Sequence, residues 1–202
     1  MKLDRKFNRA WEESVKAGRP DSLDSQWRAM RDMAPRHESA LLDAAINAAD
    51  SAHRAAAIFA IGHALEPSAS RLAVLLDAAH DPNSTVRNNA VRGLGEWAHR
   101  HPEWRTKMPP DIGIGMVRSG TWSDRNKGAF ILSELTETRD KGVLGKIRDE
   151  AMSSLREMAA WRWSGHNTYA RLILGRIAGI EEVRLRKMID DGDLAGVLQA
   201  LR

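Results

Sequence analysis

His99, His101 and Glu103 are the residues whose types and spacing come nearest to a metal site. Two imidazoles and a carboxylate suit zinc, but a complete site needs a further ligand and supporting contacts, and no distant histidine matches them. The chain has no cysteine, which excludes a disulfide scaffold, a thiol nucleophile and thiolate-bound zinc or iron–sulfur clusters. The sequence therefore predicts no metal site and no cofactor.

Tryptophan is frequent, and two groups of tryptophans lie beside charged residues. Trp122 precedes Asp124 by two residues, and Trp161-Arg162-Trp163 places a guanidinium between two rings. Rings with arginine can stack on bases and contact phosphate, whereas buried rings fill irregular space between helices. We favour the packing role, with Trp97 in the core. Because no HExxH, serine elbow or glycine-rich loop between a strand and a helix occurs, no catalytic residue is predicted.

Composition and charge limit the partners. The chain has 202 residues and a net charge of +4, with 23 arginines against 8 lysines. Arginine suits bidentate contacts to carboxylate or phosphate, so an acidic partner is allowed, although acidic residues interleave with the basic ones as on a solvated surface. No run of about 18 apolar residues occurs, so we expect no membrane span and a cytoplasmic location.

Apolar residues recur at helical spacing along most of the chain, and the alternation typical of strands is missing. Proline and glycine punctuate this pattern at intervals that predict short helices. The pentapeptide Leu-Leu-Asp-Ala-Ala occurs twice, at residues 41–45 and 75–79, an offset of 34 residues. A period of this length is typical of stacked helix pairs.

The second helix of each predicted pair has the same internal pattern. From an anchor residue, position +3 is small, position +7 is aliphatic and position +8 is small again. On a helix these positions form one stripe, and small residues in it let neighbouring helices approach closely. The anchors are Arg54, Arg87, Arg125 and Asn167, and the aliphatic residues are Ile61, Leu94, Leu132 and Leu174.

Residues 81–95 resemble a HEAT repeat, in particular the short variant named for phycobilisome lyases. They contain an Asp-Pro turn, then Val86-Arg87, then Ala90 and Leu94-Gly95. The resemblance implies an all-α fold, a right-handed α-solenoid of about four HEAT-like helix pairs with helical caps. We predict one domain over residues 1–202, with an N-terminal cap at 1–36, repeats at 37–180 and a C-terminal cap at 181–202.

The predicted pairs join helices near 37–49 and 52–65, 69–79 and 84–99, 110–118 and 122–136, and 141–160 and 166–179. Ser84, Ser123 and Asn167 are the predicted N-caps of three second helices, and Ser22 is the predicted N-cap of a helix around Trp27.

The resemblance also implies roles for single residues. In such repeats the turn aspartate and the helix arginine form a structural ladder, here Asp81 and Arg87, which must be paired to be tolerated in a buried place. Alkyl-base DNA glycosylases built from HEAT-like repeats use an aspartate and tryptophans, which makes Trp122 and Asp124 a catalytic alternative at the level of the fold alone. The phycobilisome name implies bilin chemistry, for which no residue is identified.

Positions +2, +5 and +9 of the second helices predict a binding surface on the inner curve of the stack. It is mixed polar and aromatic, as a protein or peptide partner requires. We therefore predict a non-enzymatic protein- or peptide-binding scaffold. The alternative is nucleic-acid binding through an arginine-rich face. The predicted binding residues are Phe59, His63, Asn89, Arg92, Glu96, Lys127, Phe130, Glu134, Tyr169 and Arg176, with Ala56 and Leu172 at the remaining positions.

Overall fold

The structure, a computed structural model, describes residues 34–162 and 164–201. Within these ranges every regular element is a helix and no strand occurs, as the sequence predicted. In the same ranges, none of the helices has both the length and the apolar character that a membrane crossing needs. The chain divides into two compact units, Met1–Trp104 and Arg105–Arg202.

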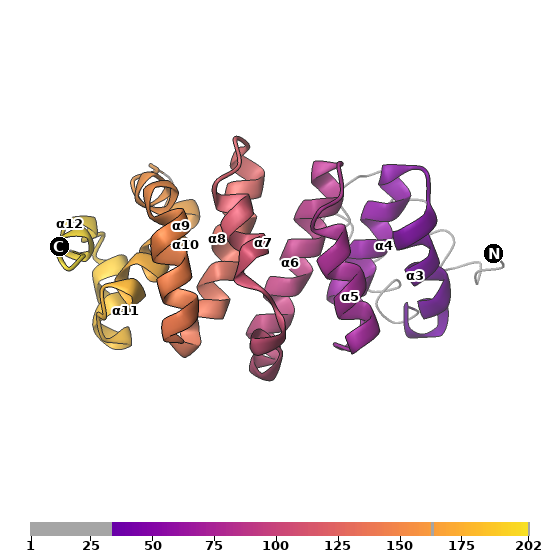
Figure 1. The fold of residues 1–202 in the computed structure, drawn as a ribbon, viewed down its shortest axis with the longest axis horizontal. Helices are drawn as coiled ribbons and strands as arrows, with labels where there is room; N and C mark the ends of the chain where they lie inside the picture. The colour runs from indigo at the N-terminus through magenta and orange to yellow at the C-terminus, as the bar shows by residue number, and fades with distance from the viewer. Residues whose placement is uncertain (1–33, 163, 202) are drawn as a thin grey trace. The chain divides into compact units, whose positions relative to one another are not determined.

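Unit 1 contains two helix pairs in its described part. Helix α3 packs on α4 and α5 packs on α6, and further contacts join α3 to α5 and α4 to α6. The first helices of the two pairs therefore form one layer and the second helices another (Figure 1). The elements are the short 3-10 helix η2 (Ala34–His37), α3 (Glu38–Asn47), α4 (Ser51–Ala64), α5 (Ala69–Ala78) and α6 (Ser84–Arg100).

Unit 2 repeats this arrangement and adds two short helices. Helix α7 packs on α8 and α9 on α10, with α7 also against α9 and α8 against α10, while α11 and α12 pack on α10. The elements are α7 (Pro110–Val117), α8 (Trp122–Leu135), η4 (Thr136–Thr138), α9 (Lys141–Ala159), α10 (Ser164–Ile177), α11 (Glu182–Asp190) and α12 (Leu194–Gln199). A further 3-10 helix, η3 (Pro102–Lys107), spans the boundary between the units in the sequence.

The eight repeat helices begin and end within two residues of their predicted bounds. Helices α11 and α12 lie in the segment predicted as the C-terminal cap. Most of the predicted N-terminal cap, with Ser22 and Trp27, lies outside the described residues. The single domain over residues 1–202 stays a prediction.

The three N-cap predictions that fall on described residues were wrong. Asn83 caps α6 instead of Ser84, because its Oδ1 accepts hydrogen bonds from the backbone N of Thr85 at 2.9 Å and of Val86 at 3.3 Å. Asparagine and serine are comparable caps, so the cap is whichever residue stands at the position from which its side chain reaches the free N–H groups. Ser84 is then the first residue of the helix.

Ser123 and Asn167 lie inside their helices. Helix α8 begins at Trp122 after Thr121, whose side chain makes no capping bond. Helix α10 begins at Ser164, and Asn167 is buried and donates from Nδ2 to the Trp161 carbonyl at 2.7 Å. Asn167 thus lies within the helix and hydrogen-bonds a backbone carbonyl of the segment before α10. Neither Ser123 nor Asn167 is an N-cap.

The repeated stripe lies in the core of both units. Its four aliphatic side chains are completely buried, and full burial of such a side chain contributes about 1.5–3 kcal/mol. The small residues at +3 and +8 are buried as well. These aliphatic residues, each 0% exposed, are Ile61, Leu94, Leu132 and Leu174.

Gly62, at position +8 of the stripe, shows why a small residue is needed there, because it lies against Gly93, at position +6 of the next second helix. A Cβ added to Gly62 would lie 2.7 Å from the Gly93 Cα, and a Cβ added to Gly93 would lie 2.8 Å from the Gly62 Cα. These contacts join backbone to backbone, so no side-chain rotation relieves them. Helices α4 and α6 therefore approach to a distance that only glycine permits on both sides.

Candidate interaction surface

Arg54 and Asp81 form an ion pair between the two helix pairs of unit 1. Arg54 donates from Nε to Asp81 Oδ2 at 2.8 Å and from Nη2 to Oδ1 at 3.1 Å. Its Nη1 donates to the carbonyl oxygens of Ala48 and Ala49 at 2.9 and 3.1 Å. One guanidinium thus fastens the end of α3 and the turn before α6 to the first turn of α4.

The Arg87 side chain binds the backbone of the same turn. Its Nη1 donates to the carbonyl oxygens of Asp81 and Pro82, each at 2.8 Å. Burial by itself would raise the pKa of Asp81, but hydrogen bonds from Arg54 and from the Asn83 backbone N outweigh it and lower this pKa below its ordinary value. Asp81 therefore stays charged, and its bidentate partner, Arg54, lies on the preceding helix pair. The structural role that the sequence suggested for Asp81 and Arg87, as members of a ladder, stays a prediction.

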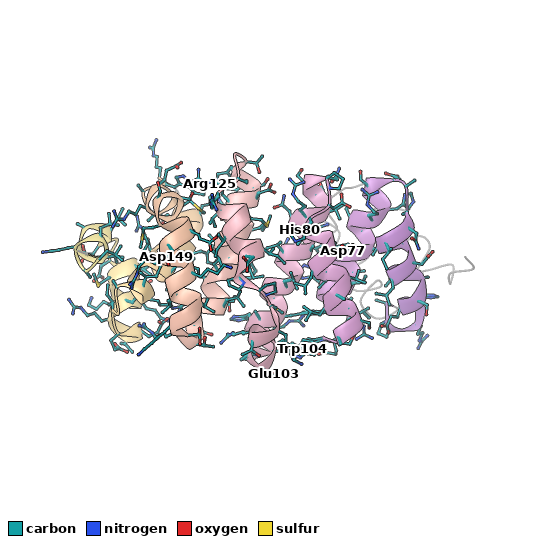
Figure 2. The ribbon with its side chains drawn as sticks, viewed as in Figure 1. Asp77, His80, Glu103, Trp104, Arg125 and Asp149 are labelled. Carbon is teal, nitrogen blue, oxygen red and sulfur yellow. The ribbon has the colours of Figure 1, made fainter. Side chains whose placement is uncertain are left out.

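Arg125 occupies the equivalent position in unit 2 and reaches α9. It donates from Nη1 to Glu157 Oε1 at 2.8 Å and from Nη2 to the Ser154 carbonyl at 3.3 Å. Its guanidinium carbon lies 5.1 Å from the centroid of the Trp161 ring, a cation–π distance. The hydrogen bond from Arg125 lowers the pKa of Glu157. Arg125, at the start of α8, is labelled in Figure 2.

Two of the ten predicted binding residues are too deep to reach a partner. Phe59 and Arg176 are each 3% exposed, so they leave the predicted surface. The other eight are half-buried, with part of each side chain open to solvent. They lie on α4 and α6 in unit 1 and on α8 and α10 in unit 2, and each set is called the second-helix face of its unit.

The second-helix face of unit 1 is polar over a buried ring. The Phe59 and His63 ring centroids lie 4.3 Å apart, so the buried phenyl group supports the imidazole above it. Asn89 donates from Nδ2 to the Ala55 carbonyl at 3.0 Å, which ties α6 to α4. Arg92 and Glu96 follow on α6 and are half-buried.

The second-helix face of unit 2 carries an aromatic pair. The rings of Phe130 on α8 and Tyr169 on α10 have centroids 5.3 Å apart and planes inclined at 50°. Both rings are half-buried, so an apolar and aromatic surface bridges the two helices. Lys127 and Glu134 lie on α8 one turn to either side of Phe130, and Glu134 is an ion-pair partner of Arg105 at 3.7 Å.

Arg176 belongs to a buried polar cluster at the end of α10. Gly179, with φ of 74°, ends this helix and turns the chain so that Glu182 comes back to the guanidinium. Arg176 donates from Nη2 to Glu182 Oε1 at 2.9 Å and from Nε to Oε2 at 3.2 Å. Its Nη1 donates to the Ser133 carbonyl at 2.5 Å and to Thr136 Oγ1 at 3.2 Å. This cluster joins α8, α10 and α11.

The Arg176 pair gives unit 2 a defined pH dependence. The hydrogen bond from Arg176 lowers the pKa of Glu182 from 4.5 to about 2. A depressed carboxyl pKa stabilises the folded state above the unfolded pKa, and this stabilisation is lost as the pH falls through the folded value. We expect Glu182→Gln to lower the free energy of unfolding by about 2 kcal/mol at pH 7 and to have almost no effect near pH 2. Urea denaturation of both proteins at the two pH values measures this; an equal loss at both would contradict it.

Trp122 and Asp124 do not present a joint open site. Trp122 is 53% exposed, with its ring edge against His166 at a centroid distance of 4.6 Å, whereas Asp124 is only 4% exposed. Trp97 is fully buried, as the core role predicted, and its ring lies 6.4 Å from that of Trp104. Trp11, Trp27 and Trp163 lie outside the described residues.

His99 lies inside α6, and His101, the residue just after this helix, lies beside two carboxylates of unit 1. His101 Nε2 lies 3.2 Å from Glu66, and its Nδ1 lies 3.8 Å from Glu103. Among residues 34–162 and 164–201, no three histidine, aspartate or glutamate side chains are placed to hold a metal ion together.

Two hollows lie away from the second-helix faces, and none of the ten predicted binding residues lines either. One, of about 360 Å³, is in unit 1 between the ends of α3 and α5. The other, of about 400 Å³, is in unit 2 beside Arg105 and Asp140, over Met108, Leu135 and Val143. The sequence pattern missed both, because loops and helix ends form them and the pattern of the stripe does not extend there.

Comparison with known proteins places the fold. Residues 38–103 match the family model for HEAT repeats. No curated protein is significantly similar in sequence. An engineered protein of known crystal structure is similar, with 20% identity over 95% of this chain and 88% of that chain and a TM-score of 0.61. Computationally designed armadillo repeat proteins for modular peptide recognition are also similar, with 12% identity over 94% and 89% and a TM-score of 0.57. These likenesses show an all-α repeat solenoid.

Proposed function

We propose that this chain, a HEAT-like repeat protein, is a non-enzymatic binding module that holds a peptide segment of a protein partner. The site is the second-helix face of unit 2. The observation that carries the proposal is the half-buried ring pair of Phe130 and Tyr169, 5.3 Å apart on neighbouring helices. Aromatic residues at the centre of a surface, with polar residues around them, are the usual anchors of protein recognition.

The surface beside the rings fits an extended segment. Polar side chains, Lys127 and Glu134, lie on α8 one turn to either side of Phe130 and form part of the rim around the rings. The helices beneath are fixed by fully buried side chains, Leu132 on α8 and Leu174 on α10, so little ordering accompanies binding. One structurally similar group of proteins was designed for modular peptide recognition, and we extend that use to this chain.

The arginines favour a protein partner over nucleic acid. Phosphate binding needs guanidinium groups that are open to an anion, and many arginines here already bind carboxylates within their unit. Arg105, for example, is an ion-pair partner of Glu137, and both Arg139 and Arg176 bind Glu182. We also propose a cytoplasmic location, with which a sequence lacking cysteine is compatible.

The proposal can be tested by selecting, from a displayed library of random peptides, those that bind the full chain and by measuring their affinity for it and for its variants. We expect Phe130→Ala and Tyr169→Ala each to weaken the selected peptide about tenfold or more, because truncation of a central ring typically costs over 1 kcal/mol. Fluorescence anisotropy with a labelled peptide measures the dissociation constants. Val183→Ala is the matched control, since Val183 is an apolar residue of unit 2 that is 75% exposed on α11, and it should bind like the wild type.

Two results would contradict this function. Selected peptides that bind both ring variants as tightly as the wild type would place the site elsewhere. Binding of duplex or single-stranded DNA at low salt, with affinity that falls steeply as salt rises, would favour nucleic acid instead. The protein is expected to show no such binding.

A further inference from the structure

The hollow of unit 1 is lined by apolar residues, called its wall, and by polar residues. Its volume is about 360 Å³, near the lower end for ligand sites. Ala45 and Ile46 of α3 face it together with Val74 and Ala78 of α5. Ile46 is 58% exposed, which is unusual for so large an apolar side chain, and it stands at the rim. This wall suits the methylene groups of a long side chain.

The lining has a net negative charge. Arg54 and Asp81 both line the hollow, but they bind each other in bidentate fashion and their charges cancel. Asp77 supplies the remaining negative charge, because its exposed carboxylate forms no hydrogen bond or ion pair with any other described residue. His80 adds no charge in its neutral form. Asp77 and His80, at the end of α5 and just after it, are both labelled in Figure 2.

Two helices point their carboxyl ends at the hollow. Helix α3 ends at Asn47 and α5 ends at Ala78, and residues from the last turn of each line it. A helix carries a partial negative charge at this end, which a nearby cation neutralises favourably. Arg54 already supplies a cation to the end of α3, because its Nη1 donates to the Ala48 and Ala49 carbonyls. The last turn of α5 contains no basic residue.

We propose that this hollow is a second docking site, which takes a lysine or arginine side chain of a protein partner. The aliphatic stem lies along Ile46 and Val74, and the cationic head lies against Asp77 and the end of α5. An anionic group is disfavoured, because the one guanidinium in the lining is already bound to Asp81 and to two backbone carbonyls. The site lies in unit 1, so it is independent of the ring pair in unit 2.

The test is an NMR titration of the full chain with lysine blocked as its N-acetyl methylamide. We expect the backbone amide signals of Ile46, Val74 and His80 to shift and saturate. The same derivative of norleucine, which has an aliphatic stem without the ammonium group, should bind more weakly by about threefold or more. Added salt should weaken the lysine compound alone, because screening acts on the charge.

Asp77→Asn removes the charge and keeps the shape of the side chain. It should weaken blocked lysine about three- to fivefold and leave blocked norleucine unchanged. Asp43→Asn is the matched control, because Asp43 is the equivalent residue of the first Leu-Leu-Asp-Ala-Ala segment, is exposed and does not line the hollow. It should bind like the wild type.

Three results would overturn the proposal: no shift at these signals, equal binding of the lysine and norleucine compounds, or equal losses in Asp77→Asn and Asp43→Asn. None of them bears on peptide binding at Phe130 and Tyr169. Conversely, loss of peptide binding in the ring variants leaves the titration of this hollow unaffected, so the two proposals fail separately.

Discussion

Arg176→Ala is expected to lower the free energy of unfolding of unit 2 by about 3–5 kcal/mol, the range for breaking a buried ion pair from one side. The side chain is 3% exposed and donates to Glu182, to the Ser133 carbonyl and to Thr136. Its removal takes away two hydrogen bonds to Glu182 and one to the Ser133 carbonyl, leaves Glu182 with Arg139 and Arg186 as its partners, and opens a space among α8, α10 and α11. Urea denaturation followed by far-ultraviolet circular dichroism measures the loss.

Arg184→Ala is the matched control for this prediction. Arg184 lies on α11, is exposed, and its side chain forms no hydrogen bond or ion pair with another described residue. Its removal should change the free energy of unfolding by less than about 0.5 kcal/mol. If Arg176→Ala were equally mild, the cluster would not hold the end of α10 in solution, and Arg176 would return to the candidate surface.

Gly62→Val is expected to destabilise unit 1 by about 3 kcal/mol, at the upper end for overpacking. Any Cβ at this position would meet the Gly93 Cα at 2.7 Å, and valine adds two methyl groups to that clash. Helices α4 and α6 would have to move apart, which would loosen the packing of Ile61 and Leu94 between them. Thermal or urea denaturation of the full chain measures the effect.

Gly145→Val is the matched control for the glycine contact. Gly145 lies inside α9, and a Cβ added there meets no atom within 4 Å. Valine is a slightly better helix former than glycine, so this change should be nearly neutral or slightly stabilising. A similar loss at both positions would mean that a general effect of valine within a helix, and not the close approach of α4 and α6, explains the result at Gly62.

The repeat and its core could be predicted from the sequence because they are encoded locally. The spacing of Ile61, Leu94, Leu132 and Leu174 on a helical period is enough to place them on one buried face. Glycine and alanine beside them predict close helix packing without any knowledge of the partner helix. The helix bounds follow from the same period and from the turns between helices.

The fate of single surface positions could not be predicted in this way. A helical wheel puts Arg176 opposite the buried stripe, but the wheel does not show that α11 folds back over the end of α10. Gly179 was the available signal, since a glycine after a helix commonly permits such a turn. Phe59 fails for the same reason: its burial depends on what lies over α4, which no local pattern describes.

The N-caps and the ladder partner depend on geometry finer than the period. Asn83 and Ser84 are adjacent and both are good caps, so only the actual start of α6 decides between them. The resemblance implied a ladder between neighbouring repeats that includes Asp81 and Arg87, but it did not say which arginine binds Asp81. Its bidentate partner is Arg54, which the stacking of two helix pairs brings to it across 27 residues.

The central claim is that the open face of α8 and α10, and not the buried stripe, binds a peptide. The most direct measurement is a crystal structure of the full chain with a peptide selected from the displayed library. We expect the peptide to lie across α8 and α10 with one of its side chains against the rings of Phe130 and Tyr169. A peptide bound on the layer of α7 and α9, with both rings untouched, would contradict it.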